Sequence, residues 1–178
     1  MTVISFDTAI VGLQHHEGWT FVGKNSYVAL VHEKENPYDE NAVAVYPIDD
    51  ENPEDIINEK MGYIPKAIAA VLCSIVPGDV SDFEARTSFE TSIKCAMSAQ
   101  INNERYNNFF PLTVKITCTD TELRKKIQDD IIRVLAQERQ RKIDDDFRKS
   151  ARKVFGDHHT DEQLDKLIDD CMGNKHKN

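Results

Sequence analysis

The sequence predicts an α+β protein: a small, partly closed β-barrel with one or two packed helices, followed by an α-helical C-terminal extension. Three observations support this fold class. Short apolar stretches with strand-like alternation recur over residues 9–118, separated by turn residues. One helical pattern interrupts them at residues 65–76. After Cys118 the apolar spacing becomes helical and continues to Gly173, a typical C-terminal helix stop.

Six segments have the alternation or the β-branched content of strands. They are residues 9–13, 27–31, 42–46, 60–64, 88–97 and 110–117. Pro65 opens the intervening helix, because proline is favoured in the first turn. The predicted buried stripe of this helix consists of Ile68, Val71, Leu72 and Ile75. Several short strands with a helix packed across them predict a curled sheet that partly closes into a barrel.

Two capping boxes predict helix starts in the C-terminal part, at residues 119–122 and 160–163. The predicted helix faces consist of Leu123, Ile127, Ile131, Val134 and Leu135, then Ile143, Phe147, Ala151, Val154 and Phe155, then Leu164, Leu167, Ile168 and Cys171. We expect residues 1–136 to form the barrel domain and residues 137–178 a helical extension. The apolar face of this extension predicts a protein partner or association with a second copy.

Charge divides the chain into two parts. Residues 1–118 carry 8 Lys and Arg against 17 Asp and Glu, whereas residues 119–178 carry 14 of each. The acidic excess of the first part argues against a broad electropositive surface. No apolar run approaches the roughly 18 residues of a membrane helix, and the first residues lack a secretory pattern. The four cysteines form no CxxC pair, so we expect reduced thiols in an intracellular protein without membrane contact.

The most informative segment is Asn36–Val45. Asn36 precedes a proline and is therefore pushed out of the helical region, and Pro37 pre-sets a turn. Asp39 and Asn41 can hydrogen-bond their own backbone. The second half alternates valine with alanine, which is typical of a strand with a buried face. A turn of this kind beside a rigid strand is either plain folding or a small binding site.

Three blocks of the chain, Thr8–Leu13, Asn36–Val45 and Met61–Lys66, resemble the blocks of the HIRAN domain family in order and spacing. The resemblance implies a small OB-like or SH3-like barrel. Members of the family stand alone or are attached to nucleases and helicases, and in one fork-remodelling member the domain grips the 3′-hydroxyl end of single-stranded DNA. The chain looks like a stand-alone member with a helical extension, in a DNA repair or replication context.

The resemblance also nominates site residues. Asp39 matches the position that would accept a hydrogen bond from a 3′-hydroxyl, because an ionised carboxylate is a strong acceptor. Tyr38 and Tyr63 could stack on the last bases. Lys66, at the predicted helix start, could meet a phosphate.

Gln14, His15 and His16 stand where the DNA-gripping member carries an arginine and two tyrosines. They would form the other wall of the site. Imidazoles can stack or hydrogen-bond, but an unperturbed imidazole is charged only near or below pH 6.5. This wall therefore lacks a permanent positive charge.

Each nominated residue also has a purely structural interpretation. Asp39 could do no more than close an Asx-turn, and Lys66 could be an ordinary solvated charge. Tyr38 could pack on the barrel, and Tyr63 could belong to the core. The chain has no phosphate-binding G-x-x-x-x-G-K-[ST] loop, no nucleophile elbow and no metal-ligand spacing. We therefore expect that the protein is not an enzyme and that it binds neither a cofactor nor a metal ion. Two hypotheses follow: a nucleic-acid end-binding module, or a non-catalytic protein-interaction module with a degenerate DNA pocket.

Overall fold

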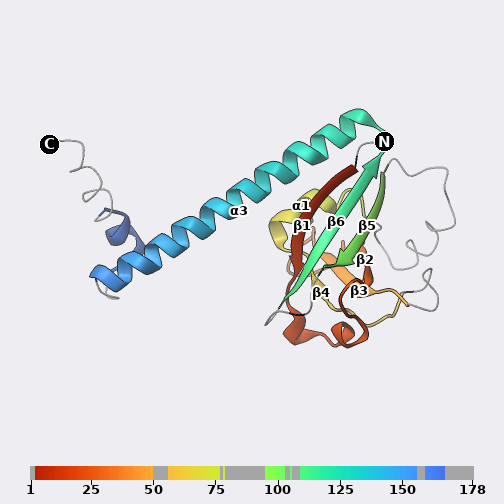
Figure 1. The fold of residues 1–178 in the computed structure, drawn as a ribbon, viewed down its shortest axis with the longest axis horizontal. Helices are drawn as coiled ribbons and strands as arrows, with labels where there is room; N and C mark the ends of the chain where they lie inside the picture. Colours follow the sequence, from red (N-terminus) through yellow and green to blue (C-terminus); the bar gives the residue numbers. More distant parts are fainter. Residues whose placement is uncertain are drawn as a thin grey trace. The chain divides into compact units, whose positions relative to one another are not determined.

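The computed structural model describes residues 3–49, 56–76, 78, 95–102, 105, 109–155 and 159–166. Its chain contacts define two compact units, residues 1–131 and residues 132–178. The first unit contains the sheet (Figure 1). No helix in the described part of the chain is long and apolar enough to cross a membrane.

The sheet has six antiparallel strands in the order β1-β6-β5-β2-β3-β4. They are β1 (Val3–Ile10), β2 (Tyr27–His32), β3 (Val43–Pro47), β4 (Gly62–Tyr63), β5 (Cys95–Ile101) and β6 (Phe110–Cys118). Strands β1, β6 and β5 lie side by side, although β1 and β6 come from opposite ends of the domain sequence (Figure 1).

The two edges of the sheet meet at one point, just after β1. Val11 and Tyr63 exchange two backbone hydrogen bonds of 2.9 Å each, which join the chain after β1 to β4. This contact closes the sheet into a half-barrel, and the predicted fold class is confirmed. Gly62 permits the close approach, because a Cβ there would lie 2.3 Å from the Val11 carbonyl oxygen.

The core is built from β3, β6 and helix α1, among other elements. All five residues of β3 are buried, which agrees with the valine–alanine alternation of this segment. On β6 every second residue is buried, from Phe110 to Cys118. Helix α1 (Lys66–Leu72) contributes Ile68, Ala69 and Leu72 to the buried set.

The first strand and the fifth differ from prediction. β1 covers Val3–Ile10, whereas the sequence predicted a strand at 9–13. Exposed positions alternate with buried Ile4 and Phe6 along it, so the short apolar run is only its end. Gly12 then turns the chain with φ +79°, and a 3-10 turn, η1 (Leu13–His15), follows. β5 begins at Cys95, and the rest of the strand predicted at 88–97 lies outside the described residues.

The prediction of reduced thiols is wrong for Cys118, which is disulfide-bonded. The pairing of β5 with β6 makes Cys95 and Cys118 direct partners in the register. The wide sequence spacing of the cysteines gave no sign of this proximity. Cys73 is a free, partly buried thiol, as predicted, and burial raises its pKa.

A single helix, α3 (Thr121–Phe155), carries the first two of the predicted helix faces. Its cap is Asp120, whose carboxylate accepts a hydrogen bond of 3.0 Å from the Leu123 amide, one position later than the predicted box. The second capping box is confirmed, since Thr160 and Gln163 exchange hydrogen bonds of 2.9 and 3.3 Å.

Candidate nucleic-acid interface

The turn after β2 is organised by the side chain of Asn36. Its Oδ1 accepts hydrogen bonds from the backbone amides of Tyr38 (3.0 Å) and Asp39 (3.2 Å). This Asx geometry is the reason that asparagine suits the position before proline here. The Ala42 amide then donates to the Asp39 carbonyl at 3.0 Å, and the chain enters β3.

Asp39 has two roles within the fold. Its Oδ1 accepts a 3.1 Å hydrogen bond from the Asn41 amide, which closes a second Asx-turn. Its Oδ2 lies 3.6 Å from the Lys66 ammonium group at the start of α1. The Asp39 side chain retains 18% of its exposure and that of Lys66 retains 79%, so this ion pair is long and solvated. The Asx-turn interpretation is therefore correct, and the other carboxylate oxygen faces an exposed cation.

Tyr38 lies on the surface. It is 92% exposed, which rules out the alternative that it packs on the barrel. Its backbone is nevertheless held by Asn36, so the ring projects from an ordered turn. The turn borders an open pocket of about 540 Å³, lined by residues 33–38 together with Lys60, Tyr63 and Gly78.

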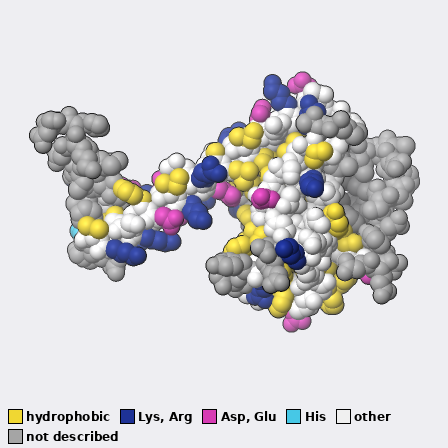
Figure 2. Space-filling model, viewed as in Figure 1, with side chains coloured by type: hydrophobic (Ala, Val, Ile, Leu, Met, Phe, Trp, Pro, Cys, Tyr) yellow, Lys and Arg dark blue, Asp and Glu magenta, His cyan; other side chains and the backbone are white. Residues whose placement is uncertain are grey.

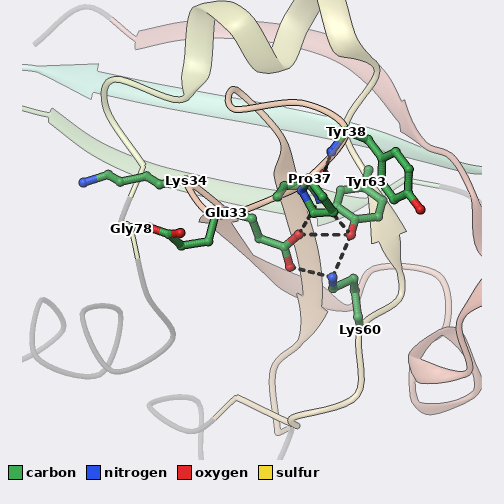
Figure 3. A pocket seen from close by; sticks show the side chains of 9 residues that line it. Glu33, Lys34, Pro37, Tyr38, Lys60, Tyr63 and Gly78 are labelled. Atoms are coloured by element: carbon green, nitrogen blue, oxygen red, sulfur yellow. Dashed lines mark hydrogen bonds and ion pairs between the residues drawn. The ribbon is translucent and has the colours of Figure 1, made fainter.

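A hydrogen-bonded cluster of Glu33, Lys60 and Tyr63 forms the floor of this pocket (Figure 3). Lys60 Nζ lies 2.5 Å from one Glu33 oxygen and donates to the Tyr63 hydroxyl at 2.7 Å. The Tyr63 hydroxyl donates to the other Glu33 oxygen at 3.0 Å. The ring of Tyr63 also packs on the hydrophobic cluster around Tyr46, so Tyr63 combines a core contact with a polar one.

These contacts shift two pKa values. Burial alone raises the pKa of the Glu33 carboxyl, but hydrogen bonds from Lys60, Asn36 and Tyr63 outweigh burial and lower it. Burial alone lowers the pKa of Lys60, and the hydrogen bonds to Glu33 and Tyr63 raise it instead. Both groups are therefore charged at neutral pH, and the pocket floor holds a fixed ion pair rather than a single charge.

The first loop meets the pocket through His16. Its ring contacts the Tyr63 ring edge-on, with centroids 5.6 Å apart. Burial, followed by the positive charge of Lys60, lowers the pKa of His16, so this imidazole is neutral at pH 7. Gln14 and His15 are exposed and hydrogen-bond each other at 3.2 Å. These contacts connect His16 to Tyr63 and, through Asn36, to the turn of Tyr38 and Asp39, where Asp39 pairs with Lys66. Gln14 and His15 lie outside these contacts.

Sequence reasoning missed Glu33 and Lys60. Both flank segments that it had singled out, since Glu33 follows β2 and Lys60 precedes Met61 of the third block. The sequence alone did not indicate that the opposite charges at 33 and 60 meet. The pairing of β3 with β4 helps to bring them together. On the face drawn in Figure 2, the Lys and Arg side chains of the first unit are separated by acidic, apolar and neutral ones.

The fold and the site define a class: a small half-barrel whose loops build an open pocket with an exposed tyrosine, a carboxylate and lysines. The sequence model of the family described as HIRAN domain matches residues 3–115. This chain belongs to the HIRAN domain family.

Two comparisons give the relationship in more detail. The helicase-like transcription factor of Oryctolagus cuniculus is 29% identical over 92 residues, which are 52% of this chain and 8% of that protein. The chain therefore spans only a small part of that relative. The crystal structure of the HIRAN domain of human HLTF has a TM-score of 0.50 at 23% identity, covering 73% of this chain and 88% of that one. That similarity supports the fold.

The chain also resembles one further solved structure. It is the HLTF HIRAN domain in its DNA-bound conformation, with a TM-score of 0.46 and 22% identity, over 73% of this chain and 87% of that one.

Proposed function

We propose that this chain is a non-catalytic nucleic-acid-binding module that recognises single-stranded DNA at its 3′-hydroxyl end, in DNA repair or replication. The observation that carries the proposal is the 92% exposed ring of Tyr38 next to the Asp39 carboxylate, both held in one ordered turn. An exposed aromatic side chain that buries nothing offers a stacking platform for a base. Membership of the family, one of whose domains has been solved in a DNA-bound conformation, agrees with this.

The chemistry of a 3′ end fits the polar groups beside Tyr38. A terminal hydroxyl donates a hydrogen bond, and an ionised carboxylate such as Asp39 only accepts. A terminal phosphate would meet the same carboxylate with like charge. Lys66 is 79% exposed and 3.6 Å from Asp39, so it is free to turn toward a backbone phosphate at little cost. The site therefore discriminates between the two kinds of end.

Fluorescence anisotropy with a labelled single strand ending in a 3′-hydroxyl or a 3′-phosphate tests the proposal, at low and at physiological salt. We expect the hydroxyl end to bind more tightly. Asp39→Asn keeps an oxygen that can accept from the Asn41 amide, so the turn persists while the charge is lost. We expect this variant to lose most of the preference for the hydroxyl end.

Glu40→Gln is the matched control, because it removes an equal charge from the exposed neighbouring side chain. It should keep the preference. Equal affinity of the unmodified protein for both ends, or absence of binding at low salt, would overturn end recognition.

The second candidate is a protein-interaction module. Glu33 and Glu35 line the same pocket as Lys34 and Lys60, and the domain as a whole is acidic. This mixed lining suits a peptide that carries both charges better than a polyanion. Absence of DNA binding at low salt would favour this second candidate.

A further inference from the structure

Helix α3 carries a stripe of exposed apolar side chains within the second unit. Ile132, Ile143 and Val154 are 58%, 54% and 77% exposed, and each follows the previous one by eleven residues. Phe147, 49% exposed, follows Ala136 by the same interval. Eleven residues make about three helical turns, so these five positions fall within an arc of about 60°. Together they form the α3 stripe.

The neighbouring face of α3 is already covered. Arg148 makes a two-pronged ion pair with Asp165, at 3.0 and 2.9 Å, and Arg152 pairs with Asp161. Between these pairs Ala151 is buried, as is Leu164 of the helical segment at residues 161–166. Sequence analysis put Ala151 on one face with Ile143 and Phe147. The structure assigns Ala151 to the intramolecular contact and leaves the α3 stripe uncovered by this segment.

The stretch 136–147 of α3 is exposed on nearly every side. All of its side chains except half-buried Glu138 are exposed. Most of the stability of a helix in a protein comes from tertiary packing of an apolar face. An apolar stripe repeating every eleven residues is the pattern of a helix that packs along another helix with a slight right-handed supercoil.

We propose that the α3 stripe binds the same stripe of a second copy, antiparallel, with the two-fold axis at Ile143. In that arrangement Ile132 lies opposite Val154 and Ile143 lies opposite itself. The stripe spans residues 132–154, about 33 Å of helix. This proposal is independent of DNA binding, since it uses only the second unit.

Charge complementarity selects the second copy and its direction. Arg139 and Asp146 lie on the same flank of the stripe, on either side of Ile143. Antiparallel pairing brings Arg139 of each copy within one residue, about 1.5 Å of helix rise, of the height of Asp146 of the other. Symmetry then gives two such ion pairs. A parallel, in-register pair would instead bring Asp146 of one copy beside Asp144 of the other. The antiparallel arrangement therefore places opposite charges beside each other, whereas the parallel arrangement places two carboxylates beside each other.

Sedimentation equilibrium of the full chain tests the proposal. We expect a concentration-dependent mass that rises from 20.3 kDa toward twice that value. Ile143→Glu places two like charges at the symmetry axis and should leave a monomer that binds DNA as well as the unmodified protein. Gln137→Glu, a change at an exposed position off the α3 stripe, should still dimerise. A constant mass of 20.3 kDa up to the solubility limit, or a dimer that persists in Ile143→Glu, would overturn the proposal.

A charge exchange tests the direction. Arg139→Asp and Asp146→Arg should each weaken the dimer several-fold, and the two substitutions in one chain should restore it. Helicity measured by circular dichroism serves as the folding control for each variant. A double variant that dimerises no better than the single ones would exclude the antiparallel pairing.

Discussion

The side-chain amide of Asn36 donates a hydrogen bond of 3.3 Å to the hydroxyl of Tyr63, 27 positions later in the chain. The Oδ1 of the same amide accepts from the amides of Tyr38 and Asp39. One side chain thus fixes the turn that exposes Tyr38 and ties it to the pocket floor on β4. This hydrogen bond joins two of the three sequence blocks that resemble the family, Asn36–Val45 and Met61–Lys66.

We expect Tyr63→Phe to lower the free energy of unfolding by about 1–2 kcal/mol, because the hydroxyl bonds to charged Glu33 and Lys60 in a half-buried site. The ring and its core packing remain. Urea unfolding monitored by fluorescence measures the change. Tyr46→Phe is the control, since its hydroxyl makes a longer bond of 3.4 Å to Glu33 and should cost less. Equal losses of unfolding free energy in both variants would contradict the prediction that the Tyr63 hydroxyl contributes more to stability than the Tyr46 hydroxyl.

Stability should fall in acid through Glu33. The pKa of this carboxyl in the folded chain is lower than its ordinary value of 4.5, because the hydrogen bonds it accepts outweigh burial. A group whose folded pKa is lowered stabilises the fold above the unfolded value and loses that contribution as pH drops through the folded one. We therefore expect urea midpoints to decline from about pH 4.5 downward. Glu33→Gln should flatten this decline, whereas Glu35→Gln, at an exposed position, should not.

Tyr38→Ala should leave the unfolding midpoint unchanged, because the ring is 92% exposed and contributes nothing to the core. Affinity for single-stranded DNA should drop by about 1–3 kcal/mol, the value of one base stacked on an aromatic side chain. Tyr27→Ala removes another exposed ring, at the start of β2, and should change affinity little. An unchanged DNA affinity in Tyr38→Ala would show that the Tyr38 ring does not stack on a base.

A positive charge in the first loop should strengthen DNA binding. Gln14 is exposed at the position where the family resemblance implies an arginine, and neutral His16 supplies no charge there at pH 7. Gln14→Arg should tighten binding and steepen the salt dependence by about 0.7 in log K against log salt, the effect of one added phosphate contact to a single strand. Gln137→Arg adds the same charge on α3. An identical gain in this control would mean that only net charge had changed.

Gly62→Ala should destabilise the domain. Its Cβ would lie 2.3 Å from the carbonyl oxygen of Val11, and backbone there cannot move without breaking the bridge to Tyr63. The expected loss is about 3 kcal/mol, at the upper end for overpacking. Gly23→Ala meets nothing within 4 Å and should be tolerated. A thermal midpoint for Gly62→Ala equal to that of Gly23→Ala would show that the barrel edge does not need this contact.

Sequence patterns predicted correctly those features that depend on interactions between residues close together in the chain. The Asx-turn at Asn36, the alternation of β3 and the capping box at Thr160 depend on residues within a few positions of each other, and all three were predicted correctly. The short apolar run at 9–13 was misassigned, because the strand before it is half exposed and its polar positions hid the alternation. The domain boundary predicted after residue 136 stays a prediction.

The sequence by itself determined the family, the fold class and the nomination of Tyr38, Asp39, Tyr63 and Lys66. Only the tertiary structure decided what these residues touch. Glu33 and Lys60 meet because β2, β3 and β4 pair, and Ala151 separates from Ile143 because a later helical segment covers one face of α3. Contacts between distant segments depend on register and packing, which a single sequence does not encode locally.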